Sequence, residues 1–344
     1  MVTARIVPGV NYAFIKGQQV FTSTVGFSTW VPENVQLSPF AQYDLASLTK
    51  VLGTTTVFLQ LYEEGQLNFS EPLQQFIPTF KDHRVRLSHL LTHTSGIRGY
   101  IEHRDELSAR ELIEAIINLP VTDEFDEKVR YSDTNFILLG LVLEVIFDKP
   151  VWQVITEQVI RPMHLQATTF YPDKKNSVPT TMREDGTLIQ GVVHDPKAQV
   201  LKEHCGSAGL FSDLNDLVVM AQGYLGLNRD ILPLHQETVA ELFKPKTRPT
   251  MDFRSWGFDM VFDPIDQHAI ILHTGYTGTL VVFDRLMRTG MILLTNRVHP
   301  SGNNQIFITR ARRSLRASWM KISVKKCSFP IWKTAFLLIF SCVR

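Results

Sequence analysis

Residues 45–62 read LASLTKVLGTTTVFLQLY, and this run of small and apolar residues decides the fold. A helix that is apolar on every side is buried in the centre of a protein, and Gly65 supplies a C-terminal stop. Ser47 and Lys50 stand at the start of this segment, where polar side chains need partners or a purpose. The run therefore predicts a buried central helix that carries two polar side chains at its N-terminal end.

Ser47 and Lys50 are three residues apart, so they share one face of a helix and the Lys50 amine can reach the Ser47 hydroxyl. The N-terminus of a helix also favours negative charge at this point. We therefore interpret the pair as an activated nucleophile. A Ser-x-x-Lys pattern also arises by chance in a chain of 344 residues, and an ordinary helix start is the alternative interpretation.

The apolar patterns on either side of this helix predict the fold class. Strands are expected in a hairpin over residues 11–27 and in four later runs, 254–262, 269–274, 279–285 and 289–297. Helical patterns lie between them: a helix headed by Ser88, a capping box from Ser108 to Glu111, and the runs 135–147, 151–160 and 216–225. We expect an α/β fold of the α+β type, with an antiparallel sheet flanked by helices and an inserted, mostly helical domain.

The expected domain boundaries follow from the same patterns. Residues 1–75 and 200–305 form the α/β domain with the antiparallel sheet, residues 76–199 form the helical domain, and residues 306–344 form a basic and apolar C-terminal tail. A cleft between two such units is where a ligand is expected to bind.

Two further motifs accompany the Ser-Lys pair. Tyr131-Ser132-Asp133 precedes the helix expected at 135–147, and His273-Thr274-Gly275-Tyr276 follows a predicted strand. In this order and spacing the three motifs resemble those of the serine β-lactamase and penicillin-binding protein superfamily. The chain is most similar to the class C β-lactamase branch, with its DD-peptidase and esterase relatives. The segments 90–96, 194–198 and 206–212 also resemble family segments, and the resemblance covers about residues 10–300.

The resemblance implies roles for four catalytic residues. Ser47 would attack a carbonyl and become acylated, while Lys50 and Tyr131 would share the proton that Ser47 loses. A tyrosine can act as a base only where nearby positive charge stabilises its phenolate, and Lys50 would supply that charge. The backbone N–H groups of Ser47 and Tyr276 would form the oxyanion hole.

The resemblance further implies that Asp133, His273, Thr274 and Gly275 contact the substrate, with Gly275 allowing close approach to the strand edge. The third motif most often begins with Lys, which holds a substrate carboxylate, but here His273 stands in its place. A histidine with an ordinary pKa is mostly uncharged at neutral pH. Anionic substrates should therefore be anchored more weakly, which favours an esterase or peptidase over a β-lactamase.

Structural interpretations of the same residues stay open. Asp133 has two: it either caps the following helix, or it pairs with Lys50 where class C β-lactamases frequently have Asn. Tyr131 is alternatively a buried amphipathic side chain, and His273 a core histidine. We interpret His93 as a structural residue at the end of a helix.

No cofactor and no metal are expected. His194, Asp195, His204 and Cys205 match no standard zinc spacing, and neither a phosphate loop nor a dinucleotide fingerprint is present. The three cysteines do not form a disulfide pattern.

Charge is distributed unevenly along the chain. The net charge is +1, but every Asp and Glu lies at or before Asp284, and the last 60 residues contain 12 Arg and Lys. The acidic body argues against nucleic acid as a partner. The N-terminal residues show no continuous apolar run, which predicts no secretory signal and a cytoplasmic location. The tail would either contact an anionic membrane surface or stay disordered, and the second interpretation is favoured.

The favoured function is a serine hydrolase that forms an acyl-enzyme with small esters or amides. The alternatives are a β-lactamase or D-alanyl-D-alanine carboxypeptidase, a catalytically silent penicillin-binding sensor, and an interaction protein that acts through its basic tail. The expected partner is a small ester, amide or β-lactam substrate.

Overall fold

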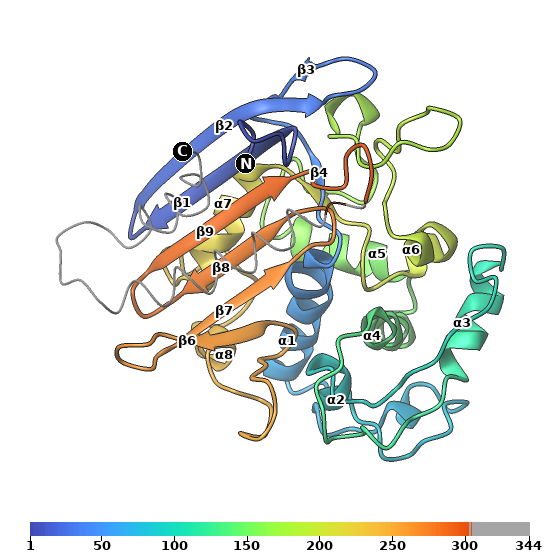
Figure 1. Cartoon of the computed structure of the whole chain (residues 1–344). Helices are drawn as coiled ribbons and strands as arrows, with labels where there is room; N and C mark the ends of the chain where they lie inside the picture. The colour runs from blue at the N-terminus through green and yellow to red at the C-terminus, as the bar shows by residue number, and fades with distance from the viewer. Residues whose placement is uncertain (303, 305–344) are drawn as a thin grey trace.

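A seven-stranded antiparallel sheet forms one side of the protein (Figure 1). The computed structural model describes residues 1–302 and 304, so the predictions for the tail at 306–344 lie outside the described residues. The strand order is β3-β2-β1-β9-β8-β7-β6, which places strands from the two ends of the chain side by side at the β1–β9 pair. The seven strands are β1 (Gly9–Lys16), β2 (Gln19–Thr29), β3 (Val35–Gln36), β6 (Asp259–Phe262), β7 (Ala269–Thr274), β8 (Leu280–Asp284) and β9 (Thr289–Thr295).

The remaining elements are mostly helical. The α-helices are α1 (Thr55–Glu63), α2 (Leu87–Leu91), α3 (Ala109–Ile117), α4 (Asp133–Phe147), α5 (Val151–Ile155), α6 (Pro196–Leu201), α7 (Leu214–Tyr224) and α8 (Gln236–Glu241). The described part also contains two π-helical turns, η1 (Lys50–Thr54) and η3 (Thr156–Ile160). It contains three short 3₁₀ turns, η2 (Leu73–Gln75), η4 (Lys174–Asn176) and η5 (Lys202–His204). A second, two-stranded sheet is formed by β4 (Tyr43–Asp44) and β5 (Phe211–Ser212). None of the described helices is long and apolar enough to cross a membrane.

The fold class predicted from the sequence is confirmed. Helix α7 packs against β1 and β9 on one face of the sheet, and α2 to α6 gather on the side of α1 that faces away from the sheet (Figure 1). The apolar run 45–62 lies in the centre as predicted: Leu48 to Leu59 are fully buried throughout. Helix α4 is buried over residues 135–143, so two central helices and the sheet share one large hydrophobic core.

The central helix differs from the prediction in one respect. A π-helical turn, η1, precedes α1, and its C-terminal N–H, from Thr55, bonds the Lys50 carbonyl. Thr54 donates its hydroxyl to the Gly206 carbonyl at 2.7 Å, so this turn is tied to a neighbouring loop as well as to its own helix. π-turns inside α-helices are rare and are frequent at functional sites.

Two predicted element starts are also corrected. The strand expected over 254–262 begins only at Asp259, because Gly257 has a φ of +77° and turns the chain before the sheet. The helix expected to begin with Ser88 starts at Leu87 with Arg86 as its N-cap, because the Arg86 N–H donates a hydrogen bond to Nδ1 of the His89 ring.

Candidate active site

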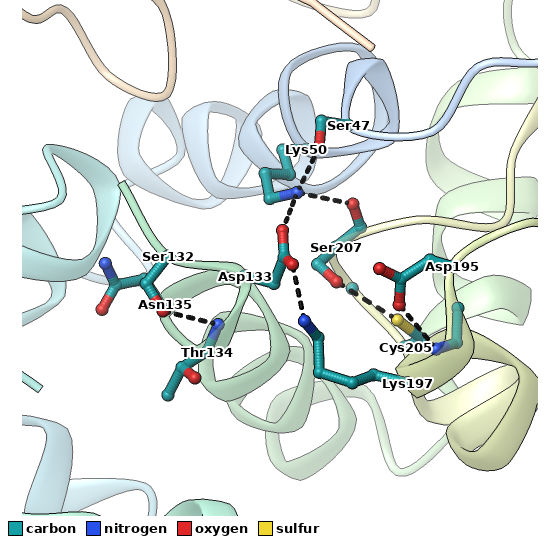
Figure 2. A network of polar contacts seen from close by, with 12 residues as sticks. Ser47, Lys50, Ser132, Asp133, Thr134, Asn135, Asp195, Lys197, Cys205 and Ser207 are labelled. Atoms are coloured by element: carbon teal, nitrogen blue, oxygen red, sulfur yellow. Dashed lines mark hydrogen bonds and ion pairs between the residues drawn. The ribbon is translucent and has the colours of Figure 1, made fainter. Parts of the chain in front are cut away.

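Ser47 lies at the entrance of the central helix, one turn before η1. The Lys50 ammonium donates a hydrogen bond to the Ser47 hydroxyl, with 2.9 Å between Nζ and Oγ (Figure 2). Ala46, just before Ser47, has a φ of +46°, a strained conformation for a residue with a side chain. The buried Asp44 carboxylate accepts the Ala46 N–H at 2.8 Å and holds this conformation. The local strain presents Ser47 at a fixed point on the helix end.

Lys50 is fully buried, and each of its three N–H groups has an acceptor. Besides Ser47, the acceptors are the Ser207 carbonyl at 2.9 Å and the Asp133 carboxylate at 2.8 Å (Figure 2). Burial alone would lower the pKa of Lys50, but the charges of Asp133 and Tyr131 outweigh it and place this pKa above its ordinary value. Lys50 is therefore a charged donor at neutral pH.

Asp133 lies between two ammonium groups. Its second oxygen accepts from Lys197 of α6 at 2.7 Å, so one carboxylate bridges Lys50 and Lys197 (Figure 2). Burial opposes this charge, yet the two lysines lower the pKa of Asp133 well below its usual range. The interpretation of Asp133 as a helix cap is wrong: Ser132 is the N-cap of α4, and its hydroxyl accepts the Thr134 N–H.

Tyr131 completes the group around the nucleophile. The Lys50 Nζ lies 5.3 Å from the centroid of its ring, and this proximity favours the charged form of Lys50. The ring packs on His93, with 4.5 Å between the two centroids, and on His273 at 5.9 Å. Because the ring is 48% exposed, one side of Tyr131 remains open to a substrate. The structure thus brings Ser47, Lys50 and Tyr131 together.

His273 heads the third motif at the end of β7, and it carries no charge. The ring is buried, and its Nδ1 lies 3.0 Å from the Thr274 carbonyl. Burial, together with the positive charges of Arg254 and Lys50, holds the pKa of His273 far below its ordinary value. The position where the family most often has a lysine is therefore neutral, while the Thr274 side chain beside it is exposed.

The turn after β7 carries the predicted oxyanion hole. The hydroxyls of Thr277 and Thr279 donate to the Asp44 and Leu45 carbonyls, at 2.7 and 3.1 Å, and tie this turn to the segment that leads into Ser47. Within the described residues, no acceptor receives the backbone N–H of Ser47 or of Tyr276. Two N–H groups from two segments are thus left available beside the nucleophile, as an oxyanion hole requires.

Gly275 allows this close approach, since a Cβ there would lie 2.5 Å from the Leu45 carbonyl oxygen and 2.0 Å from the Thr279 hydroxyl. We expect Gly275→Ala to push the turn away from Leu45 and displace the Tyr276 N–H. Loss of one oxyanion donor costs about 10²- to 10³-fold in kcat, and the hydrolysis of p-nitrophenyl butyrate measures this. Gly290→Ala, whose Cβ would meet the tip of Leu225 at 3.0 Å and the Val282 carbonyl oxygen at an ordinary 3.4 Å, is the matched control in the same sheet. Equal activity in both variants would contradict the role of the turn.

Several residues of the site were not identified from the sequence. Lys197 and Ser207 contact the Asp133–Lys50 pair, and Arg254 is a buried cation whose charge helps to keep His93 and His273 neutral. His93, interpreted as structural, holds the start of α4: its Nδ1 accepts from Asn135 at 2.9 Å and from the Ser132 N–H at 3.3 Å. A signal for His93 was present, because it lies in a segment that resembles the family. The same signal was present for Lys197 and Ser207, which lie in the segments 194–198 and 206–212, but Arg254 lies in no such segment.

The four residues weighed as metal ligands take separate positions. Asp195 caps α6, and the His194 ring packs on Tyr276 with 5.4 Å between the centroids. His204 lies 3.0 Å from a Glu144 oxygen, and Cys205 contacts the Ser207 hydroxyl. The four side chains thus contact four different partners and do not converge on one point as metal ligands would.

The fold and the site together define a serine hydrolase that acts through an acyl-enzyme: a hydroxyl held by a buried ammonium, a phenol beside it, and two available backbone donors.

Comparison with known proteins agrees with this class. The family model for Beta-lactamase matches residues 1–312, so the chain belongs to the Beta-lactamase family. An N-acetylmuramyl-L-alanine amidase of Bacillus subtilis (strain 168) is 29% identical over 319 residues, which cover 77% of this chain and 71% of the relative. A putative D-alanyl-D-alanine carboxypeptidase of Escherichia coli (strain K12) is 27% identical over 343 residues, with 85% and 79% covered. Among solved structures, EstCE1, a hydrolase with promiscuous acyltransferase activity, shares the fold with a TM-score of 0.70 at 20% identity, over 88% of this chain and 92% of that one.

Proposed function

We propose that the protein hydrolyses small esters or amides through an acyl-Ser47 intermediate, with Tyr131 as the proton acceptor. The observation that carries this assignment is the state of Lys50. Its three N–H groups donate to Ser47, Ser207 and Asp133, so it holds the Ser47 oxygen as a charged donor and has no lone pair to accept a proton. The oxygen of Tyr131, whose ring centroid lies 5.3 Å from the Lys50 Nζ, is then the group left to receive the proton.

The steps of the reaction follow from these positions. The Ser47 O–H bond breaks as Oγ attacks the substrate carbonyl, and the proton passes to the oxygen of Tyr131, which acts as a phenolate beside the Lys50 ammonium and becomes a neutral phenol. The N–H groups of Ser47 and Tyr276 bind the oxyanion. Tyr131 then returns the proton to the leaving group, and a water molecule activated in the same way releases the acyl group from Ser47.

The neutral state of His273 supports a particular class of substrate. A substrate with a carboxylate on its leaving group would meet no cation at the head of the third motif, since burial keeps His273 uncharged. Substrates whose leaving group is neutral lose nothing there. This favours an esterase or amidase over a β-lactamase.

A second candidate is an amidase or peptidase that acts on cell-wall fragments. It is supported by the names of the two relatives given above, each of which is covered over more than two thirds of its length. The exposed edge at Thr274, beyond the last residue of β7 that pairs with β6, could accept an extended peptide as an added strand.

Rates on three substrates distinguish these functions. We expect the highest kcat/KM with p-nitrophenyl butyrate, and lower values with a chromogenic cephalosporin and with a D-Ala-D-Ala peptide. A D-Ala-D-Ala peptide as the best substrate would replace the esterase assignment by the second candidate. Fastest turnover of the cephalosporin would contradict the inference from the neutral His273.

Tyr131→Phe tests the proton acceptor. The phenyl ring keeps the contact with His93 and loses only the hydroxyl, so the fold should be unchanged. Loss of a general base lowers kcat by about 10²- to 10⁴-fold, and steady-state kinetics with p-nitrophenyl butyrate measure it. Tyr171→Phe, which removes a hydroxyl from an exposed tyrosine, serves as the control. Full activity of Tyr131→Phe would assign the base to another group.

A further inference from the structure

Lys50, Asp133 and Lys197 form a continuous charge cluster beside the nucleophile. The Lys197 Nζ lies 2.7 Å from one oxygen of Asp133, and the other oxygen lies 2.8 Å from the Lys50 Nζ (Figure 2). The Lys50 ammonium in turn donates to the Ser47 hydroxyl at 2.9 Å. Lys197, which is partly buried, is therefore linked to the nucleophile through two charged side chains in direct contact.

A buried carboxylate fixes the segment that carries Lys197. In the turn before α6, the His194 N–H donates to one oxygen of Asp44 at 2.6 Å. The other oxygen of Asp44 accepts the Ala46 N–H at 2.8 Å, directly before Ser47. The same side chain thus holds the backbone on both sides of the charge cluster, so the place of Lys197 relative to the nucleophile does not depend on the ion pair alone.

The net charge of the cluster depends on Lys197. Two ammoniums and one carboxylate leave one net positive charge, and the Lys50 Nζ of this cluster lies 5.3 Å from the centroid of the Tyr131 ring. Without Lys197, the charges of Lys50 and Asp133 would cancel, and the Tyr131 oxygen would lie beside a neutral pair. Burial opposes the charge of Lys197, but Asp133 and Asp195 raise its pKa, so Lys197 is charged at neutral pH.

We propose that Lys197 is a positioning residue that acts through Asp133: its ammonium balances the Asp133 carboxylate, so that Lys50 keeps its full positive charge for catalysis. This inference rests on the proposed function. In the acylation step the Ser47 O–H bond breaks, the bond from Oγ to the carbonyl carbon forms, and the carbonyl electron pair moves onto its oxygen. The proton moves to the Tyr131 phenolate. Lys197 lowers the energy of that phenolate without touching the substrate.

Other titratable and charged groups surround the charge cluster and Tyr131. They are two histidines, two arginines, two acids and one thiol: His93, His273, Arg104, Arg254, Asp44, Asp195 and Cys205. Burial keeps both histidines uncharged and raises the pKa of the Cys205 thiol to about 11. Burial also raises the pKa of Asp44 to about 6, so Asp44 titrates where the acidic limb of a rate profile is expected. A direct titration of Tyr131 must therefore accompany the kinetics.

Variants of the charge cluster separate an electrostatic role from a structural one. The measurements are the pH profile of kcat/KM with p-nitrophenyl butyrate and the tyrosinate absorbance of each protein, compared with the same protein carrying Tyr131→Phe. Lys197→Met keeps the length of the side chain and removes its charge, so the acidic limb and the Tyr131 pKa should both move up by about one pH unit. Asp133→Asn removes the opposite charge, and both should move down.

The double variant Asp133→Asn/Lys197→Met removes one charge of each sign, so both values should return close to those of wild type. Lys197→Arg keeps the charge and should also leave the acidic limb in place. Lys16→Met, at the exposed last residue of β1, is the control for the loss of one surface cation. This control should leave the profile and the titration unchanged.

The signs of the two single shifts and the recovery in the double variant decide the result. An ion pair with only a structural role would lower activity without moving the Tyr131 pKa, or would move it in the same direction in both single variants, and either outcome overturns the proposal. Circular dichroism and thermal unfolding identify a variant that fails to fold, and the comparison of Lys197→Met with Lys197→Arg then still gives the sign. Failure of the proposed function itself would appear separately, as full activity of Tyr131→Phe in the wild-type background.

Discussion

Ser47→Ala is expected to lower kcat on small esters by on the order of 10⁴- to 10⁶-fold, because the acyl-enzyme can no longer form on Ser47. The Lys50 ammonium loses only one of its three acceptors, and both the Asp133 pair and the Ser207 bond remain. The fold should therefore persist. The measurement combines kcat on p-nitrophenyl butyrate with labelling by a fluorophosphonate or penicillin probe, followed by mass spectrometry of the intact protein.

The control for this prediction is Ser70→Ala, in an exposed loop far along the chain from the site. This control should keep both activity and labelling. Labelling of the Ser47→Ala protein, or unchanged turnover, would show that another residue is the nucleophile. A wild type that accepts the probe but releases no product from any ester would instead identify the silent sensor considered from the sequence.

Much of the fold could be predicted because its signals are local. The capping box is formed by Ser108 and Glu111, whose side chains each accept the backbone N–H of the other. Helix α3 begins at Ala109, directly after Ser108. Strands β7, β8 and β9 lie within two residues of the predicted runs. In each case the pattern and its cause occupy one short segment, so no knowledge of distant contacts was needed.

The environment of the catalytic groups could not be predicted in the same way. Lys197 and Arg254 come from separate segments, and the folding of the whole chain places Lys197, 19% exposed, beside Asp133 and buries Arg254. One charged residue leaves no periodicity in a sequence. Asp133 shows the same limit: local preference allowed a helix cap, but Ser132 adopts the extended conformation a cap requires, with a φ of −149°, and Asp133 pairs with two lysines instead.

Asp133→Asn is expected to destabilise the protein by about 3–5 kcal/mol at neutral pH, the typical cost of breaking a buried ion pair. The amide leaves the Lys50 and Lys197 ammoniums next to each other with no anion between them. The pKa of Asp133 is lowered in the folded protein, so the stability it provides is present above the ordinary aspartate pKa of about 4. That stability is lost as the pH falls below this value, because protonation removes the same charge that the mutation removes.

The difference in unfolding free energy between wild type and Asp133→Asn should therefore shrink as the pH falls from 7 to about 3. Urea unfolding at several pH values measures it, with Asp105→Asn as the control, since Asp105 is exposed and Arg104 is its one ion-pair partner in the described part of the chain. The control should match wild type at every pH. A difference that stays constant with pH would mean that packing of the side chain, and not its charge, stabilises the site. In that case the bridge between the two lysines would have no part in keeping Lys50 protonated beside Ser47.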